Sequence, residues 1–186
     1  MIKSKTINLT NGKRIDLYDD IFTFGERLVL YDTFRNCPFF MRGTDDSIID
    51  HQSDITMVHE VTQDFLNNTR FLKVLSGEPE FNELITKYKV NSAIVNVTTP
   101  ADKYHKHVDI VGGKTLLYYV NMDWNPSFFG ETVFVGDRDD DYQFVAPYVP
   151  GRIVVFDGEI PHIIRPQIMS GPKYRMTFAI KFVLAV

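Results

Sequence analysis

The sequence has a single cysteine, and it lacks both a long apolar run and an excess of basic residues. With Cys37 alone, no disulfide can form within the chain, which favours a reducing, cytoplasmic interior over secretion. Lysines stand among the first residues, where a signal peptide would have its apolar core. No segment approaches the roughly 18 apolar residues of a membrane-spanning helix. We therefore expect an intracellular protein without a membrane partner.

The charge balance argues against a nucleic-acid partner. Lys and Arg number 20 against 24 Asp and Glu, which gives a formal net charge of -4. A chain with this balance has no general attraction for the phosphate backbone of DNA or RNA. A nucleic-acid substrate is accordingly disfavoured.

Aromatic residues, by contrast, are plentiful. They make up 13% of the 186 residues, and hydrophobic residues as a whole make up 44%. A chain of this length can bury a sizeable core, and abundant aromatic residues favour β-structure. No internal repeat and no Pro- or Ser-rich linker divides the sequence, so we predict one domain over residues 1–186.

The pattern of apolar residues changes near residue 90. Before it, residues 15–34, 57–67 and 79–88 show spacing closer to that of helices than to strict alternation. We therefore predict a helical support region over residues 1–90.

After residue 90 the sequence alternates between short strand-like runs and turns such as Gly112-Gly113 and Pro150-Gly151. Many short strands at this spacing are typical of a sandwich or a jelly roll. We predict a mainly β fold with N-terminal helices, in which residues 91–186 form a cupin-like double-stranded β-helix core. The predicted strands are residues 92–98, 115–121, 131–135, 142–146, 152–156, 161–165 and 174–183.

A candidate metal site begins with His107 and Asp109. Side chains two positions apart on a strand point to the same face, so this imidazole and carboxylate would converge. Iron(II) oxygenases use two His and one carboxylate on one face of the ion, and His162 on a later strand is the natural third ligand. His105 shares the face of His107, and a His-x-His pair of this kind would suit zinc or copper instead.

Arg175 follows on the next predicted strand, which is otherwise largely apolar. A guanidinium inside such a strand is costly unless it is paired, and its planar fork can hold a carboxylate through two hydrogen bonds. Thr177 lies two positions on, where its hydroxyl could reach the same carboxylate. The competing interpretation is an ion pair with Asp157 or Glu159.

These features together resemble the iron(II)/2-oxoglutarate-dependent dioxygenases, and most closely the prolyl 4-hydroxylase group. The resemblance covers residues 92–183. The chain departs from the family at Phe129, where a glycine is common, and at Lys181, where oxygen-sensing relatives carry a tryptophan. Four stretches carry the resemblance: residues 104–109 with His-x-Asp, residues 117–124 ending in Asn-Met-Asp-Trp, residues 130–132 (Gly-Glu-Thr), and Pro161-His162 with residues 174–177 (Tyr-Arg-Met-Thr).

The resemblance implies roles for these positions. His107, Asp109 and His162 would bind iron and carry catalysis. The other cofactors would be 2-oxoglutarate as cosubstrate and O2, with ascorbate supporting turnover by keeping iron ferrous. The distal carboxylate of 2-oxoglutarate would be held by Arg175, Tyr119 and Thr177.

The implied reaction is hydroxylation of a substrate C–H bond, with release of succinate and carbon dioxide. The leading expectation is a peptide or protein substrate hydroxylated at proline, with Tyr104 bordering it. Two alternatives stay open: the same chemistry on a small molecule or nucleobase, and a jelly-roll binding module without turnover.

Overall fold

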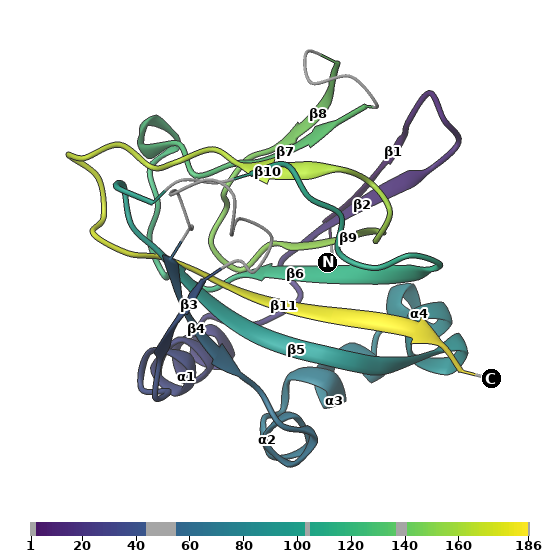
Figure 1. Ribbon diagram of the computed structural model, residues 1–186. Helices are drawn as coiled ribbons and strands as arrows, with labels where there is room; N and C mark the ends of the chain where they lie inside the picture. The colour runs from purple at the N-terminus through teal and green to yellow at the C-terminus, as the bar shows by residue number, and fades with distance from the viewer. Residues whose placement is uncertain (1–2, 44–54, 103–104, 137–140, 186) are drawn as a thin grey trace.

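Two antiparallel sheets face each other in the computed structural model, which describes residues 3–43, 55–102, 105–136 and 141–185 (Figure 1). The small sheet has the order β10 (His162–Ile164), β7 (Thr132–Val135) and β8 (Tyr142–Ala146). This arrangement confirms the predicted mainly β, jelly-roll class. The large sheet has the order β1 (Lys3–Asn8), β2 (Arg14–Asp19), β9 (Ile153–Asp157), β6 (Gly113–Tyr119), β11 (Arg175–Leu184), β5 (Tyr88–Thr98), β4 (Ile55–Glu60) and β3 (Phe40–Gly43).

The helices lie against the large sheet on the face turned away from the small sheet (Figure 1). The longest begins at a capping box, in which Thr23 and Glu26 satisfy each other's backbone N–H groups. The predicted helix over residues 79–88 is confirmed as a 3-10 turn that continues into α4. The helical elements are α1 (Phe24–Arg35), α2 (Gln63–Asn68), α3 (Phe71–Ser76), η1 (Pro79–Phe81), α4 (Asn82–Lys87) and, between β6 and β7, η2 (Pro126–Phe128).

Two predicted helices begin too early in the sequence. Residues 15–19 belong to β2 and residues 57–60 belong to β4, and in each case the helix starts only after a threonine cap. Ile15 and Leu17 alternate toward the space between the sheets, while Tyr18 packs under the helices. The apparent helical spacing therefore combined a strand, a turn and a helix. The described residues before Tyr88 contribute four strands, β1 to β4, to the large sheet as well as helices.

The large sheet is buried on both faces, and its central strand β11 shows the division most clearly. Phe178 and Phe182 belong to a hydrophobic cluster with the helices, in which Phe34 and Phe71 also pack. The residues that alternate with them, such as Arg175, face the space between the sheets. A second cluster fills that space with aromatic side chains and includes Tyr119, Trp124, Phe134, Tyr148 and Phe156.

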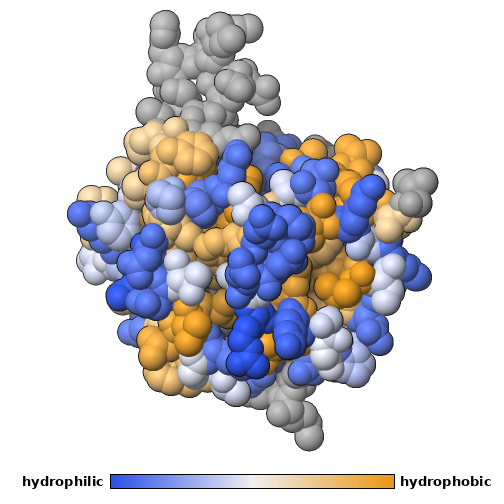
Figure 2. Space-filling model, turned by 90° about the horizontal axis from the view of Figure 1, so that it is seen from below, coloured by the Kyte–Doolittle hydropathy of each residue, from blue (hydrophilic) through white to orange (hydrophobic). Residues whose placement is uncertain are grey.

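The helical side of the molecule carries hydrophilic and hydrophobic side chains side by side (Figure 2). On α1, Phe24, Leu28 and Val29 are exposed. None of the helices in the described part of the chain is long and apolar enough to cross a membrane.

Candidate active site

Three polar side chains meet at the open end of the space between the sheets, and the main chain positions each of them. His107 and His162 face each other as a cross-strand pair: His107 N–H donates to the His162 carbonyl at 3.1 Å, and His162 N–H donates back at 2.9 Å. Asp109 N–H donates to the Gly158 carbonyl at 2.9 Å. Backbone hydrogen bonds thus set the spacing of these side chains before any ligand is considered.

The side-chain geometry suits a metal ion. One ligand atom from each of His107, Asp109 and His162 lies within 4.8 Å of the others. His107 Nε2 is 3.8 Å from Asp109 Oδ1, and His162 Nε2 is 3.6 Å from Asp109 Oδ2. The Nδ1 atoms lie against carbonyl oxygens, of His105 at 3.1 Å and of Ile160 at 3.0 Å. An Nδ1 beside a carbonyl must carry the proton, which leaves each Nε2 lone pair for a metal.

Burial keeps His162 in the form that binds a metal. Its side chain lies against the rings of Phe134 and Phe156 and is almost fully buried. Loss of solvent lowers the pKa of His162 to about 4, despite the nearby Asp109 carboxylate. The contact between His162 and Asp109 is therefore one between a neutral imidazole and a carboxylate at neutral pH.

Asp109 is held in its charged form, with both oxygens engaged. Burial opposes the charge, but His162 and Lys181 outweigh it, so the pKa of Asp109 lies below its usual value. Thr115 Oγ1 donates to Oδ2 at 2.9 Å, and Lys181 Nζ lies 2.8 Å from Oδ1. The sequence pointed to neither contact: Thr115 looked like an ordinary strand residue, and Lys181 only like a departure from a family pattern.

Arg175 is completely buried between the sheets, at the start of β11. Its Nε donates to the Gly130 carbonyl at 2.8 Å. Its guanidinium lies over two tyrosine rings, 5.6 Å from the centre of Tyr119 and 5.1 Å from that of Tyr148. Among the described residues, neither Nη1 nor Nη2 has a hydrogen-bond partner. A buried cation with four unpaired N–H groups is costly unless a ligand completes it.

The competing interpretation of Arg175, an ion pair with Asp157 or Glu159, does not hold. Asp157 pairs with Lys114, and Glu159 pairs with Lys13 at 3.3 Å. The terminal nitrogens of Arg175 thus have no partner among the residues that the structure describes.

Tyr119 and Thr177 lie on the same side of the large sheet as Arg175. They are direct neighbours across β6 and β11, and both are buried. The Tyr119 hydroxyl donates to Thr132 Oγ1 at 2.9 Å, so its oxygen can still accept a hydrogen bond. Tyr118 points to the opposite face and packs with Phe22 and other aromatic rings.

Sequence reasoning missed Tyr148, which stacks on Tyr119 with ring centres 4.4 Å apart. Nothing in its local sequence separates Tyr148 from a core tyrosine.

The turn at Phe129 and Gly130, in contrast, is marked in the sequence by its glycine. Gly130 has a φ of +83°, and a Cβ there would meet Arg175 Cδ at 3.3 Å. Phe129 has a φ of 62° and ψ of -138°, a strained conformation for a residue with a side chain.

Two further residues complete the expected list. The three-ligand group contains His107 and leaves out His105, whose carbonyl instead accepts the hydrogen bond of His107 Nδ1. Tyr104 lies outside the described residues.

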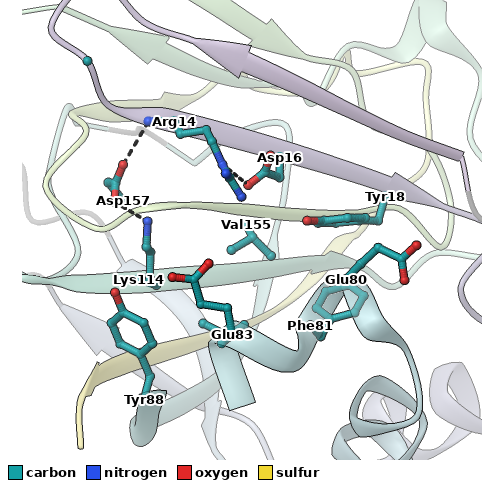
Figure 3. Close-up of a pocket in the computed structure, with 12 residues that line it drawn as sticks. Arg14, Asp16, Tyr18, Glu80, Phe81, Glu83, Tyr88, Lys114, Val155 and Asp157 are labelled. Atoms are coloured by element: carbon teal, nitrogen blue, oxygen red, sulfur yellow. Dashed lines mark hydrogen bonds and ion pairs between the residues drawn. The ribbon is translucent and has the colours of Figure 1, made fainter. Parts of the chain in front are cut away.

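A cavity of about 270 Å³ opens on the outer side of the large sheet between β2, β6, β9 and α4 (Figure 3). Two pairs of charged groups line it: Arg14 contacts Asp16 at 2.7 Å, and Lys114 contacts Asp157. The residues that line it include none of His107, Asp109 and His162.

Comparisons with known proteins bear on this arrangement. No protein-family model and no curated protein matches the sequence. Solved structures do match. A prolyl-4-hydroxylase from Pseudomonas putida superposes with a TM-score of 0.61 over 92% of this chain and 93% of that one, at 14% identity. The fold is that of the 2-oxoglutarate and iron(II) oxygenases.

Two other matches carry bound molecules. A prolyl hydroxylase from Trichoplax adhaerens, in complex with a hypoxia-inducible-factor peptide, gives a TM-score of 0.60 at 16% identity, over 97% of this chain and 83% of that one. HygX from Streptomyces hygroscopicus, with nickel and 2-oxoglutarate bound, gives 0.64 at 8% identity, over 91% and 82%. The predicted resemblance to the prolyl 4-hydroxylase-like group is thereby confirmed at the level of fold.

Proposed function

We propose that this protein is an iron(II)/2-oxoglutarate-dependent dioxygenase that hydroxylates a C–H bond of its substrate. The observation that carries the proposal is the presence of two groups on the same side of the large sheet. One is a His-Asp-His group with the donor set that iron(II) oxygenases use. The other is a buried guanidinium whose terminal nitrogens lack partners among the described residues.

The metal would be held by His107, Asp109 and His162. Three protein ligands on one face leave the remaining positions of an octahedral ion open, as a cosubstrate and O2 require. When bound, iron(II) would supply the reduction of O2 that is coupled to decarboxylation of 2-oxoglutarate to succinate and carbon dioxide. The protein's own part is to fix the ligands through backbone hydrogen bonds and to surround His162 with aromatic rings that exclude water.

Arg175 supports a dicarboxylate as the cosubstrate. Its Nε is already used by the Gly130 carbonyl, so the two terminal nitrogens are oriented and available for one carboxylate. Tyr119 and Thr177 border the same space. Thr177 would donate its hydroxyl to that carboxylate, and Tyr119 would do so by turning its O–H away from Thr132. The other end of a 2-oxo acid would then reach toward the three metal ligands.

For the substrate we propose a peptidyl proline. Support comes from the structural likeness to two prolyl hydroxylases, one of which was solved with a peptide. The likeness to an epimerase from nogalamycin biosynthesis, with a TM-score of 0.63 at 11% identity, favours a small molecule as the second candidate. The complete metal group together with the unpaired guanidinium disfavours a binding module without turnover.

The test is conversion of 2-oxoglutarate to succinate by the purified protein with iron(II), O2 and ascorbate. We expect turnover in the unaltered protein, and its loss in His107→Ala and Asp109→Ala. His105→Ala is the matched control, because it removes a neighbouring imidazole outside the three-ligand group. Turnover that survives in Asp109→Ala, or that disappears in His105→Ala, would overturn the metal assignment.

The substrate class needs a separate experiment. Proline-containing peptides and a panel of small molecules would be incubated with the active protein, and the gain of one oxygen atom followed by mass spectrometry. Oxygen transfer to a peptide prolyl residue supports the proposal. Transfer only to small molecules would replace it with the second candidate.

A further inference from the structure

Lys181 places a positive charge on the candidate metal ligand Asp109. It lies on β11, on the same face as Arg175 and Thr177, six positions beyond Arg175. The pairing of β11 with β5 shifts register between Lys181 and Phe182, so that one residue of β5, Asn91, has no partner.

The contact between the two side chains is close and shielded. Lys181 Nζ is 2.8 Å from Asp109 Oδ1 and 3.5 Å from the Asp109 carbonyl oxygen. Only 9% of the Asp109 side chain and 26% of the Lys181 side chain is exposed. Charges that are this poorly solvated interact more strongly than the same charges at the surface.

Any ion bound through Asp109 must share that carboxylate with the ammonium group. A divalent metal and Lys181 then repel each other, because both are cations close to one ligand. A 2-oxo dicarboxylate held at one end by Arg175 brings its other carboxylate to the metal, and this negative charge attracts Lys181. The ammonium therefore opposes the first binding event and favours the second.

We propose that Lys181 is a built-in counter-cation that makes metal and cosubstrate bind cooperatively. It weakens the hold of the site on a bare divalent ion and strengthens the binding of the anionic cosubstrate once the ion is present. The inference rests on the proposed function, since it assumes that the three ligands bind a metal. It gives Lys181 a role through charge, in addition to any steric role.

A purely positioning role for Lys181 predicts the opposite sign. If the lysine served only to orient Asp109, removing it would weaken metal binding, and loss of such supporting contacts typically costs about 10- to 100-fold in metal affinity. Removal of a repelling charge should tighten metal binding instead. The sign of one measured change therefore separates the two roles.

The experiment measures binding, not turnover. Cobalt(II) is titrated into metal-free protein by calorimetry, and 2-oxoglutarate is then titrated into the cobalt-loaded protein, both without O2. For Lys181→Met we expect cobalt(II) to bind about tenfold more tightly and 2-oxoglutarate about tenfold more weakly, within the usual range of coupling between two ligands. Lys181→Gln should shift both affinities in the same directions, because it also removes the charge while keeping a hydrogen-bond donor for Asp109.

Lys114→Met is the matched control. Lys114 is similarly half-buried and paired with a carboxylate, Asp157, but it lines the cavity on the outer side of the sheet (Figure 3). Lys114→Met removes the same charge from the protein. The affinities for cobalt(II) and for 2-oxoglutarate should both stay within about twofold of those of the unaltered protein.

The outcomes distinguish the two proposals. Suppose that the unaltered protein binds cobalt(II) and that both Lys181 variants bind it equally tightly or more weakly. This result would overturn the counter-cation role and leave the proposed function standing. A failure of the unaltered protein to bind cobalt(II) would overturn both. Should Lys181→Met not fold, because it leaves Asp109 buried without its partner, Lys181→Gln decides the matter.

Discussion

The two faces of β11 differ in what they contribute, although the residues that form them alternate along one strand. The outer face carries Phe178 and its apolar neighbours, which pack under the helices. The inner face carries Arg175 and Lys181, whose charges are costly to bury. Lys181 pairs with Asp109, whereas the terminal nitrogens of Arg175 have no partner in the described part of the chain. Stability and function are thus separated by strand alternation, one residue apart.

The largest effect is expected on the outer face. Phe178→Ala should lower the free energy of unfolding by about 3–5 kcal/mol, because it removes a fully buried ring and leaves a cavity. Urea denaturation measures this change. Cobalt(II) affinity of the folded variant should match that of the unaltered protein. A loss of stability below about 1 kcal/mol would show that the two faces do not divide the work in this way.

The next effect concerns pH and the metal-free protein. His162 has a pKa of about 4 when folded and 6.5 in the reference state, so the unfolded chain takes up the proton first. Stability should therefore fall as pH drops from about 6.5 to 4, by up to about 3 kcal/mol. The lowered pKa of Asp109 acts in the same direction. The contribution of its ionised carboxylate to the free energy of unfolding is lost at the acidic end of the range.

Urea midpoints between pH 4 and 8 would show this slope. His162→Gln is the comparison, because it cannot take up a proton and should flatten the slope over the upper part of the range. Equal slopes in both proteins would mean that His162 is not kept neutral by burial.

The smallest effect, and the one of opposite sign, belongs to Arg175. Arg175→Met should raise the free energy of unfolding by about 1 kcal/mol, because it removes a buried cation with unpaired N–H groups. The same variant should need about 10- to 100-fold more 2-oxoglutarate for half-maximal succinate formation, the cost of losing a two-pronged charged contact.

Arg152→Met is the matched control for that stability change. Arg152 is half-buried and bonded to both oxygens of Asp19, at 2.7 and 2.8 Å. Its loss should lower stability, since it leaves a carboxylate unpaired. If both arginine variants lose stability alike, Arg175 is a structural residue and not one kept for a ligand.

Many of the strands and the three candidate metal ligands could be predicted from local sequence pattern. The strands after residue 90 were predictable because alternation and turn residues mark them, and the run over residues 142–146 matches β8 at both ends. The strands β2 and β4 were mistaken for helices because each is followed at once by a capped helix. His107, Asp109 and His162 are brought together as the pattern suggested, although His107 forms an isolated bridge with His162 and residues 107–109 do not form a strand.

The surroundings of the site were beyond the sequence. Thr115 and Lys181 meet Asp109 only because β6 and β11 pair in one register, with Lys181 opposite Thr115. Tyr148 reaches Arg175 from a loop after β8, and no local pattern encodes that distance. Long-range register, unlike alternation, depends on the whole packed sheet.

The hydrogen bonds between the main chains of His107 and His162 determine the state of the site without metal. Because each residue donates its N–H to the other's carbonyl, the gap between the imidazoles exists without an ion to draw them together. Domains that fold only around zinc spend the metal's binding energy on ordering the chain. In this protein the site is formed before the metal binds. A chelator should therefore remove the metal, and added metal should bind again, while the fold stays intact.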